Sequence, residues 1–462
     1  MMTLAEACRI MGGTLAPAHD ERVFERVTID SRGVRAGDLF VALKGERVDG
    51  HAFVDSALAA GAAGALVRAD AAQQVRACLT VADPLLALGQ LARAWRARFT
   101  LPLIAVVGSN GKTTVTQMIA SILREHARER AFHTEGNLNN EIGLPLTLVR
   151  LRPLHTVGVV ELGMNHRGEI AYLSGIARPT VALVNNAQRE HQEFLQSVDD
   201  VAAENASVFD FLPHDGIAIV NADDAHAVYC RRRAGGRRVL SFGLDQPADI
   251  RGTAGGAAFG NHLEIQVGDG GEDARAEVPL RIAGRHNALN ALAAAAAAIA
   301  VGVPLPTIAR GLAAFTPVSG RLAKRMLANG AVVLDDSYNA NPDSVRAAID
   351  VLTGVAGRRV LVLGRMAEVG AQGPEFHREV GAYAKARGID ALLTLGPEAA
   401  EAATAFGGGA GPFADVQELI ARAREVAAPG TTLLVKGSRS ARMERVVRAL
   451  LDEGDTRLEE TH

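Results

Sequence analysis

The stretch VVGSNGKTT, from Val106 to Thr114, decides how the middle of this chain folds. Its glycines, lysine and threonines are typical of the loop that holds nucleotide phosphates, whose common form reads G-x-x-x-x-G-K-[ST]. Counted back from Gly111, the first glycine of that form falls at Val106, whereas this chain has Gly108 instead. The stretch therefore predicts a phosphate loop with a shortened glycine spacing.

The residues on either side of the loop predict a strand and a helix. The apolar run 103–107 has the length and the β-branched residues of a buried strand, and apolar residues from Lys112 to about His126 recur on one helical face. Backbone N–H groups at such a helix N-terminus bind phosphate, the lysine reaches the terminal phosphates, and the Thr113 hydroxyl can ligate Mg²⁺. The sequence thus predicts a nucleotide site that uses Mg²⁺.

The composition limits the class of protein. With 462 residues, 48% of them hydrophobic, the chain is long enough for about two to four globular domains. With a net charge of −3, the chain has no global basic field that would suggest binding to nucleic acid or an anionic membrane. The three cysteines lie far apart, which argues against disulfides and a zinc site and suits the cytoplasm. There is no signal-peptide pattern, and the alanine-rich window 287–309 holds asparagines and prolines, so we expect no membrane insertion.

Strands and helices alternate along most of the chain, which predicts an α/β fold. We place domain boundaries near residues 99 and 319, which gives three domains, 1–99, 100–319 and 320–462. The second should have a mostly parallel sheet and the third a doubly wound, Rossmann-like sheet. The other expected strands are 23–29, 39–43, 65–67, 156–160, 181–184, 217–220, 332–334, 360–363, 391–394 and 432–435, and the expected helices include 92–100 and 287–301.

Polar residues at expected strand ends are candidates for the chemistry. Glu161 ends the strand 156–160 beside the loop, where α/β sheets place ligand contacts, and His191 follows the strand 181–184. Two further stretches, 134–145 and 335–342, are rich in asparagine, which suits either turns or a polar substrate held between domains. Only five of the 49 Lys and Arg residues are lysines, so each lysine is a candidate for a specific chemical role.

At this point the motifs, taken together, resemble those of the Mur ligase family. The loop GSNGKT has the shorter glycine spacing of that family's ATP loop, which accounts for Val106. The further motifs that carry the resemblance run in order along the whole chain: DSR at 30–32, DLFVALKG at 38–45, DGHAF at 49–53, GNLNNEIGLP at 136–145, GRHNALN at 284–290, DSYNANP at 336–342 and KGSRS at 436–440.

The resemblance implies a reaction, its cofactors and its partners. ATP, with Mg²⁺, would phosphorylate the terminal carboxylate of a UDP-N-acetylmuramoyl-tripeptide, and the amine of D-alanyl-D-alanine would attack the acyl phosphate. The products would be the UDP-linked pentapeptide, ADP and phosphate. It also implies that the small N-terminal domain binds the UDP group and that the central domain is the ATPase. We expect a cytoplasmic monomer that closes around its substrates.

The same resemblance implies roles for individual residues. Catalysis would involve Lys112, Glu161 and His191. ATP would contact Gly108, Ser109, Asn110, Gly111, Lys112, Thr113, Thr114, Asn287, Asn290, Arg321, Asp336 and Asn339. The metal would be held by Thr113, Glu161 and His191. The UDP group would contact Ser31, Arg32 and Lys44, the peptidyl substrate Asn137, Asn139 and Asn140, and the carboxylate of the dipeptide Lys436, Ser438 and Arg439.

The chain also departs from the family pattern. Many relatives carry a carbamylated lysine about fourteen residues after the histidine, where this chain has Asn205, and no lysine lies between Lys112 and Lys324. We hypothesise that Glu204 supplies the missing carboxylate to the metal; the alternative is a solvated glutamate on a helix. Arg365 stands where relatives usually have an acid, so no role is assigned to it.

Other readings of the sequence stay open. The nearest is another amide ligase of the same superfamily, one that adds a single amino acid to a UDP-muramoyl peptide, or a folylpolyglutamate synthetase. The KGSRS and GNLNN motifs argue against both. A GTPase switch is a different class, but the chain has no N-K-x-D motif after the loop. The third residue of the accepted peptide, lysine or diaminopimelate, is not determined by the sequence.

Overall fold

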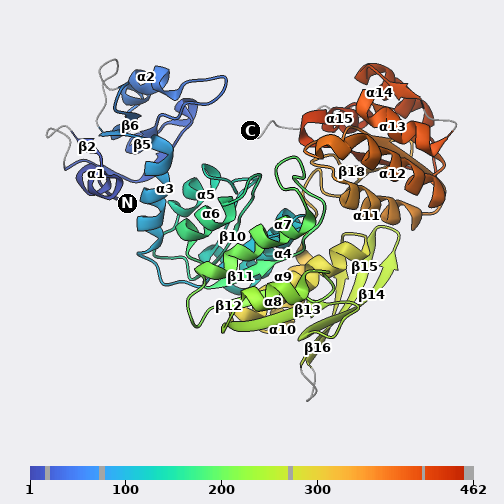
Figure 1. Cartoon of the computed structure of the whole chain (residues 1–462), viewed down its shortest axis with the longest axis horizontal. Helices are drawn as coiled ribbons and strands as arrows, with labels where there is room; N and C mark the ends of the chain where they lie inside the picture. Colours follow the sequence, from blue (N-terminus) through green and yellow to red (C-terminus); the bar gives the residue numbers. More distant parts are fainter. Residues whose placement is uncertain (16–20, 72–78, 269–273, 408–410, 452–462) are drawn as a thin grey trace.

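The computed structural model describes residues 1–15, 21–71, 79–268, 274–407 and 411–451. It has three regions, each with its own main sheet (Figure 1). The N-terminal region lies at the upper left of the view, the C-terminal region at the upper right, and the central region below them. The α/β class and the three-domain arrangement are confirmed. The boundaries at 99 and 319 stay predictions; both positions lie outside helices and strands.

The N-terminal region is built on a sheet in the order β2-β7-β6-β5-β4, in which only the β2–β7 pair is antiparallel. Its elements are β1 Met2–Thr3, α1 Leu4–Met11, β2 Thr14–Leu15, β3 Val23–Phe24, β4 Arg26–Thr28, β5 Asp38–Val41, α2 Val54–Ala59, β6 Gly64–Arg68, β7 Leu79–Val81 and α3 Pro84–Arg96. The single strand expected over 23–29 is therefore two short strands that pair in different sheets.

The last helix of this region, α3, differs from the expected helix over 92–100. It starts earlier because the Asp83 side chain caps its first turn at Leu85 and Leu86, with Pro84 at the first helical position. It ends at Arg96, whose buried guanidinium donates to the backbone carbonyls of Ala177 and Leu101. Burial lowers the pKa of Arg96 to about 10. These bonds tie the end of α3 to the central region.

The central region has a sheet in the order β16-β15-β14-β13-β12-β11-β8-β10-β9. All its pairings from β9 to β14 are parallel, and β14, β15 and β16 form an antiparallel edge that was not expected from the sequence. Its elements are β8 Leu103–Val107, α4 Lys112–Ala127, β9 Ala131–His133, α5 Gly143–Leu148, β10 Val157–Glu161, α6 Glu169–Ala177, β11 Val181–Val184, α7 Val198–Ala206, β12 Ile217–Asn221, α8 Ala227–Arg233, β13 Arg238–Gly243, β14 Ile250–Ala257, β15 Gly260–Val267, β16 Ala274–Leu280, α9 Arg285–Ala300 and α10 Leu305–Ala314.

The alanine-rich helix α9 is buried along most of its length, as a helix that is apolar all round should be. It packs with α4 and α10 over the sheet, and its side chains join one apolar core with residues of the C-terminal region such as Leu334 and Val345. Among the described residues, none of the helices is both long enough and apolar enough to span a bilayer.

The C-terminal region has a sheet in the order β17-β18-β22-β19-β20-β21, parallel except for the β17–β18 pair. Its elements are β17 Ala323–Met326, β18 Val332–Asp336, α11 Pro342–Thr353, β19 Arg358–Leu363, α12 Gly373–Ala386, β20 Ala391–Leu395, α13 Pro397–Phe406, β21 Pro412–Phe413, α14 Val416–Val426, β22 Thr431–Lys436 and α15 Glu444–Leu451. Because β18 and β22 are parallel neighbours in register, their last residues, Asp336 and Lys436, lie side by side.

Candidate active site

One cavity of 1510 Å³ lies where the central and C-terminal regions meet. Most of the site residues expected from the sequence line it: Ser109, Asn110, Gly111, Lys112, Thr113, Thr114, Asn139, Asn140, Glu161, His191, Asn287, Asn290, Arg321, Asp336, Asn339, Lys436, Ser438 and Arg439. The residues outside this lining set are Ser31, Arg32, Lys44, Gly108, Asn137 and Glu204. Ser31, Arg32 and Lys44 belong to the N-terminal region, so their expected UDP contacts concern a different surface.

The phosphate loop joins the end of β8 to the start of α4. Val106 is fully buried inside β8 and pairs with Glu161 of β10 and Leu183 of β11. The position at which the common motif has its first glycine therefore still belongs to strand β8 in this chain. Gly111 has a φ of +81°, and a Cβ atom there would lie 2.6 Å from Oδ1 of Asn290. The left-handed backbone conformation and the close approach of Asn290 on α9 both favour glycine at this position.

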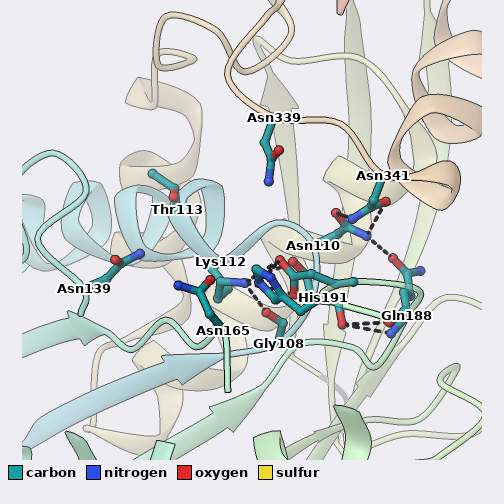
Figure 2. Close-up of polar contacts among 12 residues, drawn as sticks. Gly108, Asn110, Lys112, Thr113, Asn139, Asn165, Gln188, His191, Asn339 and Asn341 are labelled. Carbon is teal, nitrogen blue, oxygen red and sulfur yellow. Dashed lines mark hydrogen bonds and ion pairs between the residues drawn. The ribbon is translucent and has the colours of Figure 1, made fainter. Parts of the chain in front are cut away.

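Lys112, the first residue of α4, folds back onto its own loop (Figure 2). Its Nζ donates to the carbonyl oxygens of Gly108 at 2.6 Å and of Ser109 at 3.1 Å, and it lies 3.2 Å from Oε1 of Glu190. The side chains of Lys112 and Glu190 are only 13% and 8% exposed. Glu190 was not among the residues expected from the sequence, where nothing but its position next to His191 marks it.

Glu161 and Thr113 form the part of the site that fits Mg²⁺ best. Glu161 is 2% exposed at the carboxyl end of β10, and its Oε1 accepts hydrogen bonds from Thr113 Oγ1 at 3.2 Å and Asn139 Nδ2 at 2.7 Å. Its other oxygen, Oε2, is buried without a hydrogen-bond partner among the described residues. An unpaired carboxylate oxygen beside a hydroxyl matches the oxygen ligands that Mg²⁺ prefers.

His191 lies between two carboxylates. Its Nε2 is 3.4 Å from Oε1 of Glu190, and its Nδ1 is 2.6 Å from Oε2 of Glu368, although the second contact lacks hydrogen-bond geometry. Burial lowers the pKa of His191, but the two glutamates outweigh it and raise the pKa to about 9. In this arrangement the ring is protonated and has no lone pair for a metal, so ligation would require it to lose that proton.

Among the described residues, no three His, Cys, Asp or Glu side chains are grouped so as to hold a metal by themselves. Glu204, the expected substitute for the missing lysine, points elsewhere. Its Oε2 accepts from the N–H of Gly168 at 3.0 Å and its Oε1 from the N–H of Ile170 at 2.9 Å, at the start of α6. Both oxygens are therefore occupied by the N-terminus of α6, and Glu204 itself is not among the residues that line the cavity. The hypothesis that Glu204 holds the metal does not agree with this placement.

Asn110 connects the loop to both neighbouring segments (Figure 2). Its Nδ2 donates to Oε1 of Gln188 at 2.6 Å, and its Oδ1 accepts from Nδ2 of Asn341 at 2.9 Å. Its backbone N–H donates to Oδ1 of Asn186 at 2.8 Å. Asn341 belongs to the C-terminal region, where it also caps α11. The side chain of Asn110 is thus hydrogen-bonded both to the loop after β11 and to the C-terminal region.

The C-terminal wall of the cavity is held by two cations. Arg321 donates to Thr113 Oγ1 at 3.2 Å and stacks 4.1 Å from the ring centre of Tyr338. Lys436, only 3% exposed, donates to Asp336 Oδ2 at 2.6 Å and to the carbonyl of Asn339 at 2.8 Å. Burial raises the pKa of Asp336 against the opposing effect of Lys436. In this structure Lys436 therefore organises the 336–339 turn, whereas Arg439 is exposed beside it.

The two asparagines of α9, Asn287 and Asn290, belong to a chain of hydrogen bonds between side-chain amides. Asn185 Nδ2 donates to Asn290 Oδ1 at 2.9 Å, Asn290 Nδ2 donates to Asn287 Oδ1 at 3.1 Å, and Asn287 Nδ2 donates to the carbonyl of Ala283 at 2.7 Å. The chain fixes the start of α9 against the phosphate loop. Their expected contacts with the nucleotide stay predictions.

Comparison with known proteins gives the same picture along the whole chain. Three family models match in order: Mur ligase family, catalytic domain, over residues 23–96; Mur ligase middle domain over 106–298; and Mur ligase, glutamate ligase domain, over 320–439. The chain is 43% identical over 457 residues to UDP-N-acetylmuramoyl-tripeptide--D-alanyl-D-alanine ligase of Escherichia coli (strain K12), covering 98% of this chain and 99% of that protein. It is 36% identical to the ligase of the same name from Haemophilus influenzae, covering 94% and 95%.

Solved structures agree with these matches. MurF from Acinetobacter baumannii superposes with a TM-score of 0.89 at 33% identity, covering 97% of this chain and 98% of that one. MurF ligase from Thermotoga maritima in complex with ADP gives a TM-score of 0.82 at 27% identity, covering 93% and 97%. With this identity and coverage in both comparisons, and with the shortened phosphate loop in place at the cavity, the chain belongs to the Mur ligase family.

Proposed function

We propose that this chain is an ATP-dependent ligase that joins D-alanyl-D-alanine to UDP-N-acetylmuramoyl-tripeptide and releases ADP and phosphate. The observation that carries the proposal is the 43% identity, over 98% of the chain, to the Escherichia coli ligase with that name. The cavity supports it, because the phosphate loop and the KGSRS motif line the same space from opposite regions. Two anionic substrates and an amine can therefore meet there.

The reaction needs charge neutralisation and alignment. The tripeptide carboxylate attacks the γ-phosphate of ATP, ADP leaves, and the dipeptide amine then attacks the acyl phosphate and displaces phosphate. Lys112 and Arg321 would neutralise charge on the phosphates, and Thr113, Glu161 and His191 would hold Mg²⁺. Bound Mg²⁺ supplies Lewis-acid stabilisation of the phosphate oxygens. Holding three substrates in line can lower the barrier by about 7–11 kcal/mol.

The remaining roles are proposals of the same kind. Asn139 and Asn140 line the cavity near Glu161 and suit the peptidyl substrate, and Arg439, the exposed cation of the KGSRS motif, suits the dipeptide carboxylate. Lys436 would act through Asp336 and Asn339 instead of binding that carboxylate directly. The cytoplasmic location and the monomeric state stay predictions, which cell fractionation and light scattering on a size-exclusion column would test.

The test is ADP release with the tripeptide substrate and D-alanyl-D-alanine supplied singly and together. We expect turnover only when both are present, and formation of the UDP-linked pentapeptide by mass spectrometry. Two substitutions of substrate separate this ligase from the related activities. In one, a single amino acid replaces the dipeptide; in the other, folate and glutamate replace both peptide substrates. Turnover without the dipeptide, or with a single amino acid as the preferred acceptor, would contradict the proposal.

A further inference from the structure

The ammonium group of Lys112 is fully engaged inside the protein. Its three N–H donors are met by the carbonyl oxygens of Gly108 and Ser109, at 2.6 and 3.1 Å, and by the two carboxylate oxygens of Glu190, at 3.2 and 3.4 Å. An ammonium group has three donors and no acceptor, so this arrangement leaves it none to spare. To reach a terminal phosphate, Lys112 has to break at least part of this set.

Glu190 is held firmly in this position by its own loop, the segment 185–191 after β11. Asn186 Oδ1 accepts from the N–H of Asn110 at 2.8 Å, and the N–H of Gln188 donates to Ser109 Oγ at 2.9 Å. The Glu190 side chain is 8% exposed and lines the cavity. A buried carboxylate costs free energy unless a cation or donors compensate it, and Lys112 is its nearest cation, with Nε2 of His191 at 3.4 Å.

We propose that Glu190 is a built-in counter-ion of the phosphate loop, which occupies Lys112 in the place of the nucleotide's terminal phosphate and is displaced when ATP binds. The proposal rests on ATP binding at this loop, as proposed above. It assigns Glu190 a positioning role, since it acts through Lys112 and does not touch the reacting atoms.

The exchange has a consequence for how the nucleotide binds. When Lys112 turns to the phosphates, Glu190 loses its closest cation, keeps only the His191 ring at 3.4 Å, and stands next to the anionic phosphates. The repulsion between the phosphates and a carboxylate that is only 8% exposed is strong, and it is reduced when a divalent cation accompanies the nucleotide. Glu190 therefore weakens binding of a free nucleotide more than binding of its Mg²⁺ complex.

The variant that isolates this effect is Glu190→Gln, which keeps the shape and removes the charge. The probes are ADP and a non-hydrolysable ATP analogue, titrated calorimetrically against the full-length protein, once in EDTA and once with saturating Mg²⁺. We expect the dissociation constant in EDTA to fall about tenfold, the size of one charged hydrogen bond, and to fall much less in Mg²⁺. Glu190→Ala should show the same pattern, and thermal melting of both variants reports whether they fold.

The matched control is Glu193→Gln. Glu193 lines the same cavity three residues further along, its side chain is exposed, and its carboxylate makes no ion pair within the described part of the chain. It removes the same charge without releasing Lys112, so its nucleotide affinity should equal that of the wild type. An equal gain in the control would show a general charge effect and overturn the counter-ion.

Two other results would also overturn it. Unchanged or weaker binding of Glu190→Gln in EDTA would show that the carboxylate does not compete with phosphate. A raised Mg²⁺ requirement, with no gain in EDTA, would show that Glu190 serves the metal instead. Failure of the wild type to bind either nucleotide in Mg²⁺ would count against the proposed function itself, so the two failures can be told apart.

Discussion

Replacing Arg189 with methionine should separate docking of the C-terminal region from its folding. Arg189 extends from the loop after β11 and pairs with Asp343 of α11 at 2.5 Å and with Glu379 of α12 at 2.6 Å. Its guanidinium also lies 5.2 Å from the ring centre of Phe376. Hydrogen bonds to Glu379 and Asp343 raise the pKa of Arg189, so its charge is present at every working pH. Methionine keeps much of the apolar stem of the side chain and removes the guanidinium group that makes both ion pairs.

The size of the effect follows from the exposure of the three side chains, which lies between 22% and 30%. A fully exposed pair contributes about 0.2–1 kcal/mol, whereas charged, two-pronged hydrogen bonds that are partly shielded contribute more. After allowance for solvent screening, we assign about 2 kcal/mol to the docked arrangement. This corresponds to a shift of about 30-fold in the docked population. Since both regions line the cavity, kcat/KM should fall by up to that factor.

The assay is phosphate release with all three substrates, together with small-angle X-ray scattering of the free protein. We expect lower kcat/KM, a larger radius of gyration, and a melting temperature close to that of the wild type. The matched control is Arg346→Met, since Arg346 pairs with the same Glu379 at 2.9 Å but from within the C-terminal region. Wild-type scattering and kinetics for Arg189→Met, or the same losses for Arg346→Met, would refute the reasoning.

Three further predictions concern single side chains. Glu161→Gln removes the carboxylate whose buried Oε2 has no partner among the described residues, so the Mg²⁺ concentration that gives half-maximal activity should rise at least tenfold, and an unchanged titration would contradict the assignment. Glu204→Gln weakens the contact with the start of α6, and should lower the free energy of unfolding by about 1 kcal/mol while the Mg²⁺ titration stays unchanged; a raised Mg²⁺ requirement would instead restore its role as a ligand. Burial and Lys436 lower the pKa of His286 to about 4, so the folded state binds fewer protons than the unfolded state between pH 4 and 6.5 and loses stability as the pH falls through that window. In His286→Asn, urea denaturation midpoints should fall less steeply over this window, and equal slopes would show that another group controls it.

The phosphate loop could be predicted because its signals are local. A strand of β-branched residues, two glycines at positive φ and a lysine at the helix start are consecutive in the sequence, and β8 and α4 have nearly the expected bounds. Val106 differs from the common motif for a physical reason, since it is the fourth residue of a buried strand. The other expected residues of the cavity were predicted from the family resemblance, which also depends on short local motifs.

The antiparallel edge of the central sheet was missed although β15 alternates Leu263, Ile265 and Val267 with polar residues, because the strand before it, β14, has a weak signal. β14 contains Gly252, Gly255 and Gly256, which lower β propensity and give no alternation of apolar residues. Gly252 lies close to α9, because a Cβ there would lie 2.9 Å from the end of the Leu292 side chain. This close approach involves a helix 40 positions along the chain, so a sequence window does not include it.

Charged partners are the other part that the sequence could not supply. Glu190 lies 78 positions from Lys112, and Arg189 lies 154 positions from Asp343 and 190 from Glu379. These pairs form because the loop after β11 lies between the phosphate loop and the C-terminal region. Residue spacing in the sequence does not predict that position. Glu204 was assigned the role of the missing lysine from its place next to Asn205, and its contacts with the start of α6 could not be predicted either; its role at the metal stays a prediction.

Asn205, at the position of the missing lysine, is buried on α7. Asn205 is 1% exposed on α7 and lies outside the residues that line the cavity, and its Nδ2 has no hydrogen-bond partner among the described residues. Its neighbour Glu204 faces the start of α6, so this turn of α7 serves the packing of two helices. Two of the carboxylates that reach the cavity lie beside the phosphate loop: Glu161, whose Oε2 has no hydrogen-bond partner among the described residues, and Glu190, paired with Lys112. We therefore expect the metal dependence to change on substitution of Glu161 and not on substitution of residues on α7.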